Sequence, residues 1–161
     1  MKRLILVRHG KSSWKHDLPD HERPLKKRAY RDGRKVAGTF KEFYSPTATL
    51  WSSPATRALE TAKMFKEELK VPDKMFTIRQ DLYTFDAKEL LEIIKSCPDT
   101  IDKLIIFGHN PAITNAVNSL GDKNLDNFPT TGLCVIDFEN YKWERIKTGR
   151  TIITLLPKNL R

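Results

Sequence analysis

The sequence predicts an α/β fold, a three-layer α/β/α sandwich whose central sheet is mostly parallel. Strand-like segments alternate along the chain with segments of helical periodicity, an order typical of such sheets. Two short apolar runs, at 2–7 and 103–107, are typical of strands buried on both faces. The chain has 161 residues and no evident linker, so we expect a single domain over 1–161.

The first half of the chain is expected to form these elements in order: a strand over 2–7, a loop over 11–25, a helix over 26–44, a strand over 47–51, a helix starting at Ser53-Pro54 and a strand over 75–79. Apolar residues recur at helical spacing between Ala29 and Phe43, although Gly33 lowers the helix propensity there. Ser53 suits an N-cap and Pro54 suits the first helical position.

The second half is expected to continue with these elements: a helix opened by Asp86 with Glu89 as its capping-box partner, a strand over 103–107, a helix from Asn110-Pro111 to about Leu120, strands over 133–138 and 141–147, and an apolar stretch over 151–156 that is either a strand or a packed tail. The two cysteines, Cys97 and Cys134, lie far apart and match no metal spacing, so we expect free buried thiols.

The net charge of +9 implies affinity for anions, which include nucleic acids, acidic proteins and phosphorylated small molecules. The basic residues are dispersed and no nucleic-acid recognition motif is evident, so no nucleic-acid partner is expected. No apolar run is long enough to span a membrane, and the run at 4–7 is too short for a signal peptide. A cytoplasmic location is therefore expected, whereas the oligomeric state is not readable from the pattern.

Three polar clusters follow predicted strands. They are Arg8-His9-Gly10, the segment 51–58 with Arg57 near the start of a helix, and Gly108-His109-Asn110-Pro111. In open α/β sheets, ligands bind outside the carboxyl ends of the strands. The sequence therefore predicts that two arginines and two histidines converge on one rim of the sheet.

This combination of side chains suits a phosphoryl group. Arginine donates paired hydrogen bonds to phosphate oxygens, and helix N-termini add backbone donors. A neutral histidine can attack phosphorus if its other ring nitrogen donates to an acceptor. Because the arginines already supply positive charge, neither a metal nor a cofactor is expected.

The three clusters resemble the signature motifs of the histidine phosphatase superfamily, which also contains the cofactor-dependent phosphoglycerate mutases. Arg8-His9-Gly10-Lys11-Ser12-Ser13-Trp14 and Asp20-His21-Glu22-Arg23-Pro24-Leu25 are most similar to its short branch of phosphohistidine phosphatases. The resemblance implies a phosphoglycerate mutase-like fold. It implies that His9 is the nucleophile, that Arg8, Arg57 and His109 form the phosphate pocket, and that Arg23, Ser12, Gly10 and Asn110 bind substrate. For Arg23, a solvated loop arginine is an equally open interpretation.

One feature departs from the larger branches, which usually carry a Glu or Asp general acid after the third strand. Here that region passes directly into a helix, and Asp86 is better explained as its N-cap. Asp81 and Asp20 are no stronger candidates. A missing acid would hinder loss of an alkoxide more than loss of an imidazole, which can be protonated near neutral pH.

The expected partner is therefore a phosphorylated substrate, either a phosphohistidine protein or a small labile phosphoryl compound. A broad-specificity phosphomonoesterase acting on small metabolites remains an alternative, as does a non-catalytic phosphate-binding module. A mutase is less favoured, because 161 residues leave little room for the insertions that enclose a bisphosphorylated sugar.

Overall fold

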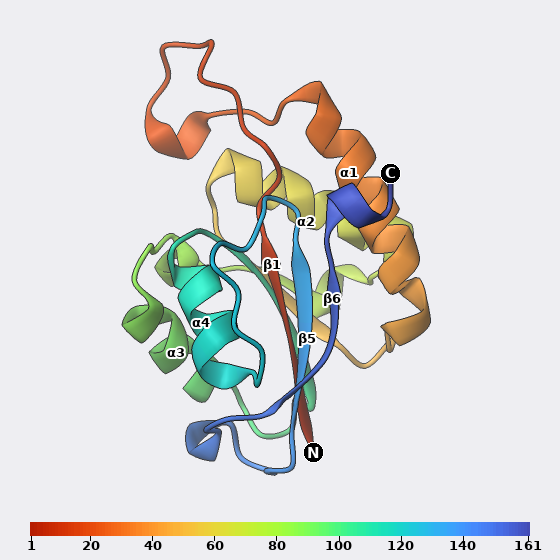
Figure 1. Ribbon diagram of the computed structural model, residues 1–161, viewed down its shortest axis with the longest axis vertical. Helices are drawn as coiled ribbons and strands as arrows, with labels where there is room; N and C mark the ends of the chain where they lie inside the picture. Colours follow the sequence, from red (N-terminus) through yellow and green to blue (C-terminus); the bar gives the residue numbers. More distant parts are fainter.

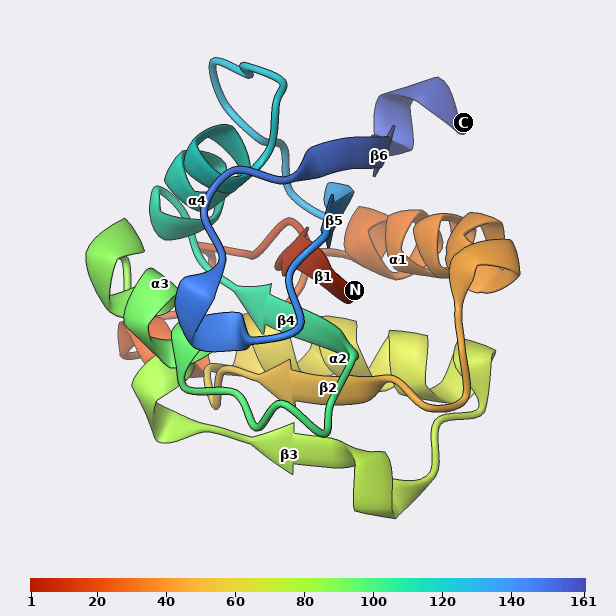
Figure 2. The same cartoon turned by 90° about the horizontal axis from the view of Figure 1, so that it is seen from below.

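A central sheet of six strands runs through the computed structural model, which describes residues 1–161, in the order β3-β2-β4-β1-β5-β6 (Figures 1 and 2). The strands are β1 (Lys2–Arg8), β2 (Thr49–Ser52), β3 (Phe76–Ile78), β4 (Lys103–Gly108), β5 (Leu133–Phe138) and β6 (Arg150–Leu155). The four strands β3, β2, β4 and β1 are parallel, whereas β5 is antiparallel to both β1 and β6. The sheet is thus mostly parallel, as predicted.

Helices cover both faces of the sheet. They are α1 (Lys27–Phe40), α2 (Thr56–Leu69), α3 (Ala87–Lys95) and α4 (Ala112–Leu120). Figure 2, which looks along the layers, shows α1 on the opposite side of β1 from α3 and α4. Successive side chains of β1 point to opposite faces of the sheet. Leu4 and Leu6 pack in the core beneath α3 and α4. Ile5 and Val7 pack in the core beneath α1 and α2. The predicted three-layer sandwich is confirmed.

The strand register brings the carboxyl ends of the three parallel strands β1, β2 and β4 to the same end of the sheet. Arg8 of β1 is paired with Gly108 of β4, and Ser52 of β2 is paired with Phe107. The backbone amide of His9 donates to the Gly108 carbonyl at 3.1 Å, so the chain is still tied to β4 where the strand ends. The three polar clusters therefore lie side by side, as the strand-end argument predicted.

Helix α1 runs through its glycines without interruption. A Cβ atom at Gly33 would lie 2.6 Å from Cε of Met64 on α2, so the glycine permits close contact between the two helices. The packing of α1 against α2 therefore explains why a residue of poor helix propensity stands in the middle of α1.

The predicted strand over 141–147 is wrong. The segment forms a short 3-10 turn, Trp143–Arg145, and pairs with no strand. Trp143 is fully buried, with Nε1 donating to the Ile101 carbonyl at 2.6 Å and its amide donating to Oδ1 of Asp99 at 2.9 Å. These contacts hold the segment against the loop before β4, and the next strand begins only at β6. The stretch over 151–156, left open between strand and tail, belongs to β6.

Two helix starts differ from the sequence prediction. Helix α2 begins at Thr56 with Ala55 as the N-cap residue, because the hydroxyl of Ser53 is bonded to His109 and also accepts from the Ala55 amide. Helix α4 begins at Ala112, although the Asn110 side chain does accept from an amide of its first turn.

The start of α3 is partly as predicted. Asp86 is its N-cap and accepts from the Lys88 amide at 3.0 Å. Glu89 does not complete a capping box, because Oε1 of Glu89 accepts from the hydroxyl of Thr84 instead. Both cysteines are buried free thiols, as expected. None of the helices has the length and hydropathy required to cross a bilayer.

Candidate active site

A cavity of about 260 Å³ lies at the carboxyl end of β1, and the loop that follows this strand forms part of its wall. Its walls are formed by Arg8, His9, Lys11, Ser12, Trp14, Asp20, Arg23, Arg57, Phe85, Asn110 and Thr130. Six of the eight residues predicted from the sequence are among them. Gly10 and His109 are not, although each contacts His9 directly.

The ring of His9 is held in one tautomer. Nδ1 lies 2.7 Å from the carbonyl oxygen of Gly10, which can only accept, so Nδ1 carries the hydrogen and Nε2 carries the lone pair. Nε of Arg57 approaches Nε2 at 3.4 Å. Burial, with the nearby charges of Arg57 and Arg8, lowers the pKa of His9 to about 4, although the Gly10 carbonyl acts in the opposite direction. At neutral pH the ring is therefore neutral and its Nε2 is nucleophilic.

Gly10 supports this arrangement through its backbone rather than by lining the cavity. Its amide donates to Oγ1 of Thr61 at 2.9 Å, and that hydroxyl donates to the carbonyl of Arg57 at 2.7 Å. A Cβ atom at Gly10 would lie 2.9 Å from Cβ of Ala29 in α1. The Gly10 amide thus already has a partner within the protein, and the contact of Gly10 with substrate stays a prediction. Thr61 was missed, although it stands four residues after Arg57 and so on the same helical face.

Asp20 links several groups of the cavity. Arg57 donates to the Asp20 carbonyl from Nη1 at 2.7 Å and to Oδ2 from Nη2 at 2.9 Å. The hydroxyl of Tyr83 donates to the same Oδ2 at 2.6 Å. Burial alone would raise the pKa of Asp20, but the hydrogen bonds from Tyr83 and Arg57 outweigh it and lower the pKa to about 2. Asp20 is thus an ionised carboxylate and not a proton donor.

Arg23 is buried and faces the cavity, so the interpretation as a solvated loop arginine is wrong. Nη1 donates to Oγ of Ser12 at 2.8 Å, and Nε donates to Oδ1 of Asp20 at 3.2 Å. The guanidinium carbon also lies 3.4 Å from the centre of the Trp14 ring. The loop that carries these residues is closed at its ends by a bridge between Ser12 and Leu25.

The ring of His109 packs beside that of His9, with 5.3 Å between the ring centres. Its Nε2 is 2.7 Å from Oγ of Ser53, whereas Nδ1 is buried without a partner. The rings of Tyr83 and Phe85 each pack at 5.4 Å from it. Burial lowers the pKa of His109 to about 3, with His9 and Arg57 as further causes, so its ring is also neutral at pH 7.

Arg8 and Asn110 are tied to the segment before β5. Nη1 of Arg8 donates to the carbonyl of Phe128 at 2.8 Å, while its buried Nε has no partner. Burial also lowers the pKa of Arg8. The amide of Asn110 donates to Phe128 and Asn127, and its oxygen accepts from Thr114. Asn110 therefore shapes one wall of the cavity through groups that are largely occupied.

The other candidate acids lie outside the cavity. Asp81 pairs with Arg79 at 2.7 Å, and Asp86 caps α3. No group of three or more metal-ligating side chains of the His, Cys, Asp and Glu types is assembled in the structure.

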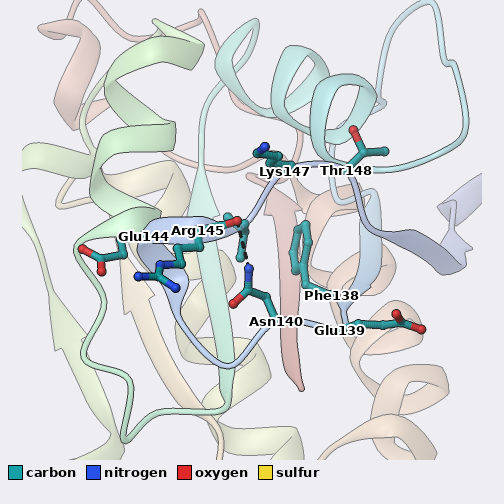
Figure 3. A pocket seen from close by; sticks show the side chains of 8 residues that line it. Phe138, Glu139, Asn140, Glu144, Arg145, Lys147 and Thr148 are labelled. Carbon is teal, nitrogen blue, oxygen red and sulfur yellow. Dashed lines mark hydrogen bonds between the residues drawn. The ribbon is translucent and has the colours of Figure 1, made fainter.

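A larger hollow of about 660 Å³ lies at the other end of the strands, near the start of β1 and the end of β5 (Figure 3). It is lined by Phe138, Glu139, Asn140, Glu144, Arg145, Ile146, Lys147 and Thr148. Phe138 is paired with Lys2, at the start of β1, whereas the cavity containing His9 lies beyond the end of that strand. The larger hollow contains no histidine or cysteine nucleophile, so the chemistry is assigned to the smaller cavity.

Comparison with known proteins agrees with this geometry. Residues 4–89 match the family described as the histidine phosphatase superfamily, branch 1. An uncharacterised chloroplastic protein of Arabidopsis thaliana is 30% identical over 155 residues, which cover 89% of this chain and 69% of that protein. An uncharacterised protein of Mycobacterium tuberculosis is 24% identical over 153 residues, which cover 89% of this chain and 93% of that protein.

Two solved structures share the fold. The protein histidine phosphatase SixA, complexed with tungstate, superposes with a TM-score of 0.83 at 18% identity and covers 99% of both chains. A mycobacterial glucosyl-3-phosphoglycerate phosphatase superposes with a TM-score of 0.67 at 13% identity, over 95% of this chain and 98% of that one. The family match shows that the chain belongs to the histidine phosphatase superfamily and is a histidine-nucleophile phosphatase, and the two structures show that it has the fold of such enzymes.

Proposed function

We propose that this phosphatase hydrolyses phosphohistidine in proteins, or a related labile phosphoryl compound, through a covalent phosphoryl intermediate on His9. One observation carries the choice of substrate. Asp20 is the sole carboxyl group lining the cavity, and the hydrogen bonds from Tyr83 and Arg57 lower its pKa to about 2. A group that is ionised at neutral pH cannot serve as a general acid for the leaving group.

The lack of a carboxylic acid affects different leaving groups unequally. An alkyl phosphate must expel an alkoxide, which is a poor leaving group unless a proton is delivered to it. The imidazole of phosphohistidine titrates near neutral pH and can take its proton from solvent. A phosphorus–nitrogen bond is therefore the bond best matched to this site.

The first step is transfer of the phosphoryl group to His9. The Nε2 lone pair forms a bond to phosphorus while the bond between phosphorus and the substrate nitrogen breaks. That nitrogen keeps the electron pair and takes a proton from water. Arg8, Arg57 and Arg23 line the cavity and supply positive charge for the phosphoryl oxygens. A bound anion would also give a partner to Nε of Arg8, which is buried without one.

The second step is hydrolysis of the intermediate. A water oxygen bonds to phosphorus, the bond between phosphorus and Nε2 breaks, and Nε2 regains its lone pair. The proton lost by the water goes to the released phosphate or to solvent. The Gly10 carbonyl keeps the hydrogen on Nδ1 throughout, because the 2.7 Å contact requires a donor there.

A substrate panel tests the proposal. The panel contains a phosphohistidine protein, phosphoramidate, a sugar phosphate, a nucleotide and a phosphoserine peptide, at matched enzyme concentration. We expect the highest kcat/KM for the two substrates with phosphorus–nitrogen bonds. Faster turnover of the sugar phosphate or nucleotide would instead show a broad phosphomonoesterase.

The intermediate is tested separately. After mixing with phosphoramidate, the adduct is mapped by mass spectrometry at alkaline pH, with His9→Ala as the matched variant. We expect a phosphoryl group on His9 and no turnover by the variant. An adduct on another residue, or normal turnover by His9→Ala, would remove His9 from the mechanism.

A further inference from the structure

Two aromatic side chains on the wall of the cavity remain open to solvent. Trp14 is 75% exposed and Phe85 is 46% exposed, and both line the cavity that contains His9. The other two tryptophans, Trp51 and Trp143, are buried. Large exposed apolar side chains gathered at a pocket mark an interaction site.

Trp14 is fixed in position on one face only. The guanidinium of Arg23 lies 3.4 Å from its ring centre. The loop on either side is anchored, because the Ser13 amide donates to the Pro24 carbonyl at 2.8 Å and the Lys26 amide donates to the Lys11 carbonyl at 2.8 Å. The indole is therefore held at the cavity with most of its surface free for another planar group.

Phe85 is fixed from a different part of the chain. Its ring packs at 5.4 Å from His109 and at 5.6 Å from Tyr83. The backbone immediately after it is held by the cap of α3, where the Asp86 amide donates to Thr84. The two exposed rings thus contact two of the predicted site residues. Trp14 contacts Arg23, which is predicted to bind substrate, and Phe85 contacts His109, which is predicted in the phosphate pocket.

We propose that Trp14 and Phe85 determine specificity by binding the planar ring of the leaving group. This inference rests on the proposed function and deepens it: the preferred substrate carries its phosphoryl group on an aromatic ring nitrogen. The cavity of about 260 Å³ lies below the roughly 300–1,000 Å³ typical of small-molecule pockets. A single phosphorylated ring presented by a larger molecule fits a cavity of this size.

Two small substrates separate ring recognition from phosphoryl recognition. Phosphoimidazole and phosphoramidate both contain a phosphorus–nitrogen bond, but only the first has a ring. Aromatic contacts are worth about 0.5–1.5 kcal/mol, so Trp14→Leu and Phe85→Leu should each lower kcat/KM for phosphoimidazole about threefold to tenfold more than for phosphoramidate. Tyr141→Leu is the matched control, since Tyr141 is also exposed but lies outside the cavity.

Equal losses for the two substrates would overturn the inference, because they would mean that Trp14 and Phe85 merely support Arg23 and His109. Unchanged rates for both substrates would overturn it as well. If the wild-type enzyme turns over both compounds but not a phosphohistidine protein, the protein substrate is removed from the proposed function. The comparison of phosphoimidazole with phosphoramidate still decides the role of the rings.

A binding measurement provides a readout independent of turnover. Because Trp14 is the exposed tryptophan, its fluorescence should respond to a ring placed against it. Phenylphosphonate should change the emission of the wild type and not that of Trp14→Leu, and methylphosphonate should have a smaller effect at equal occupancy. Equal responses to the two phosphonates would contradict ring binding.

Discussion

Arg57 and Asp20 form a two-point contact in the wall of the candidate site. Nη2 of Arg57 lies 2.9 Å from Oδ2 of Asp20, and Nη1 donates to the Asp20 carbonyl at 2.7 Å. The carboxylate orients Arg57, but it also places a negative charge beside the position proposed for the phosphoryl group. The two effects can be separated by replacing the charge while retaining the shape.

Replacement of Asp20 by Asn should strengthen anion binding. The amide oxygen can still accept from Arg57 and Tyr83, but the amide nitrogen cannot accept from Arg23, and the negative charge that opposes phosphate is gone. We expect the Kd of inorganic phosphate, measured by isothermal titration calorimetry, to fall about threefold to tenfold, equivalent to about 0.7–1.4 kcal/mol.

The Asp20→Asn variant also tests whether Asp20 acts as a general acid. Turnover of phosphoramidate should not show the large loss expected if a general acid were removed. Asp81→Asn is the control, because Asp81 is paired with Arg79 outside the cavity. Weaker phosphate binding by Asp20→Asn would show that orientation of Arg57 outweighs the repulsion.

The decrease of kcat/KM at acid pH should reflect protonation of the His9 ring. Burial and the charges of Arg57 and Arg8 lower its pKa to about 4, and the neutral ring is the reactive form. As pH falls, kcat/KM should therefore stay level to about pH 5 and decline only as the ring is protonated near pH 4. The decrease should occur at the same pH for two substrates of different pKa, once their rates are corrected for spontaneous hydrolysis, because it belongs to the enzyme. A decrease near pH 6.5 would mean that the His9 environment is not the one described here.

Replacement of Ser53 by Ala should affect both stability and rate. Oγ of Ser53 lies 2.7 Å from Nε2 of His109, and its loss leaves a buried ring nitrogen without a partner. An unsatisfied buried polar group costs about 1–3 kcal/mol, so the free energy of unfolding in urea should fall by that amount. The ring of His109 also becomes less well fixed, so kcat should fall with little change in KM.

Ser52→Ala is the matched control for this substitution. Ser52 is an equally buried neighbour, but its hydroxyl donates to the Ser53 carbonyl and not to His109. We expect a loss of stability of about 0.5–1.5 kcal/mol and a nearly normal kcat. Similar rate losses in the two variants would assign the effect to the backbone and not to the ring contact.

Replacement of Gly10 by Ala should destabilise the site because the new methyl group meets a rigid neighbour. The added Cβ would lie 2.9 Å from Cβ of Ala29 and 3.2 Å from Cδ2 of Leu25. Overpacking of this kind costs about 1–3 kcal/mol, and the Gly10 carbonyl that holds His9 would shift with it. We expect lower kcat and a lower midpoint in urea unfolding.

The double variant Gly10→Ala with Ala29→Gly tests the cause. It removes the facing methyl group, so kcat should recover even though a glycine in α1 costs about 1 kcal/mol of stability. A double variant with no recovery would indicate that the clash with Leu25 or a change in the backbone is responsible.

Much of the site was predictable from the sequence for two reasons. Short apolar runs indicate buried strands, and parallel strands of one sheet end on the same side. The apolar run before Arg8 and the one before Gly108 are sufficient to indicate buried strands. Parallel strands end at one edge, so His9 and His109 could be placed together without knowing any contact between them. Failures of prediction occurred where a side chain had a distant partner, as with Ser53, which bonds His109 instead of capping α2.

The sequence by itself determined the order of the helices and strands, apart from the strand predicted over 141–147, and the four residues predicted at the rim. Hydrophobic periodicity and strand ends are local properties. The tertiary structure decided the protonation states of those residues and the role of the loop over 11–25. That loop has no periodicity, and its effect arises from contacts between Asp20 and residues of α2 and the segment before α3. Burial and the charges of nearby arginines hold His9 neutral, whereas hydrogen bonds from Tyr83 and Arg57 hold Asp20 ionised against the effect of burial. Neither effect can be read from the neighbours of His9 or Asp20 in the chain.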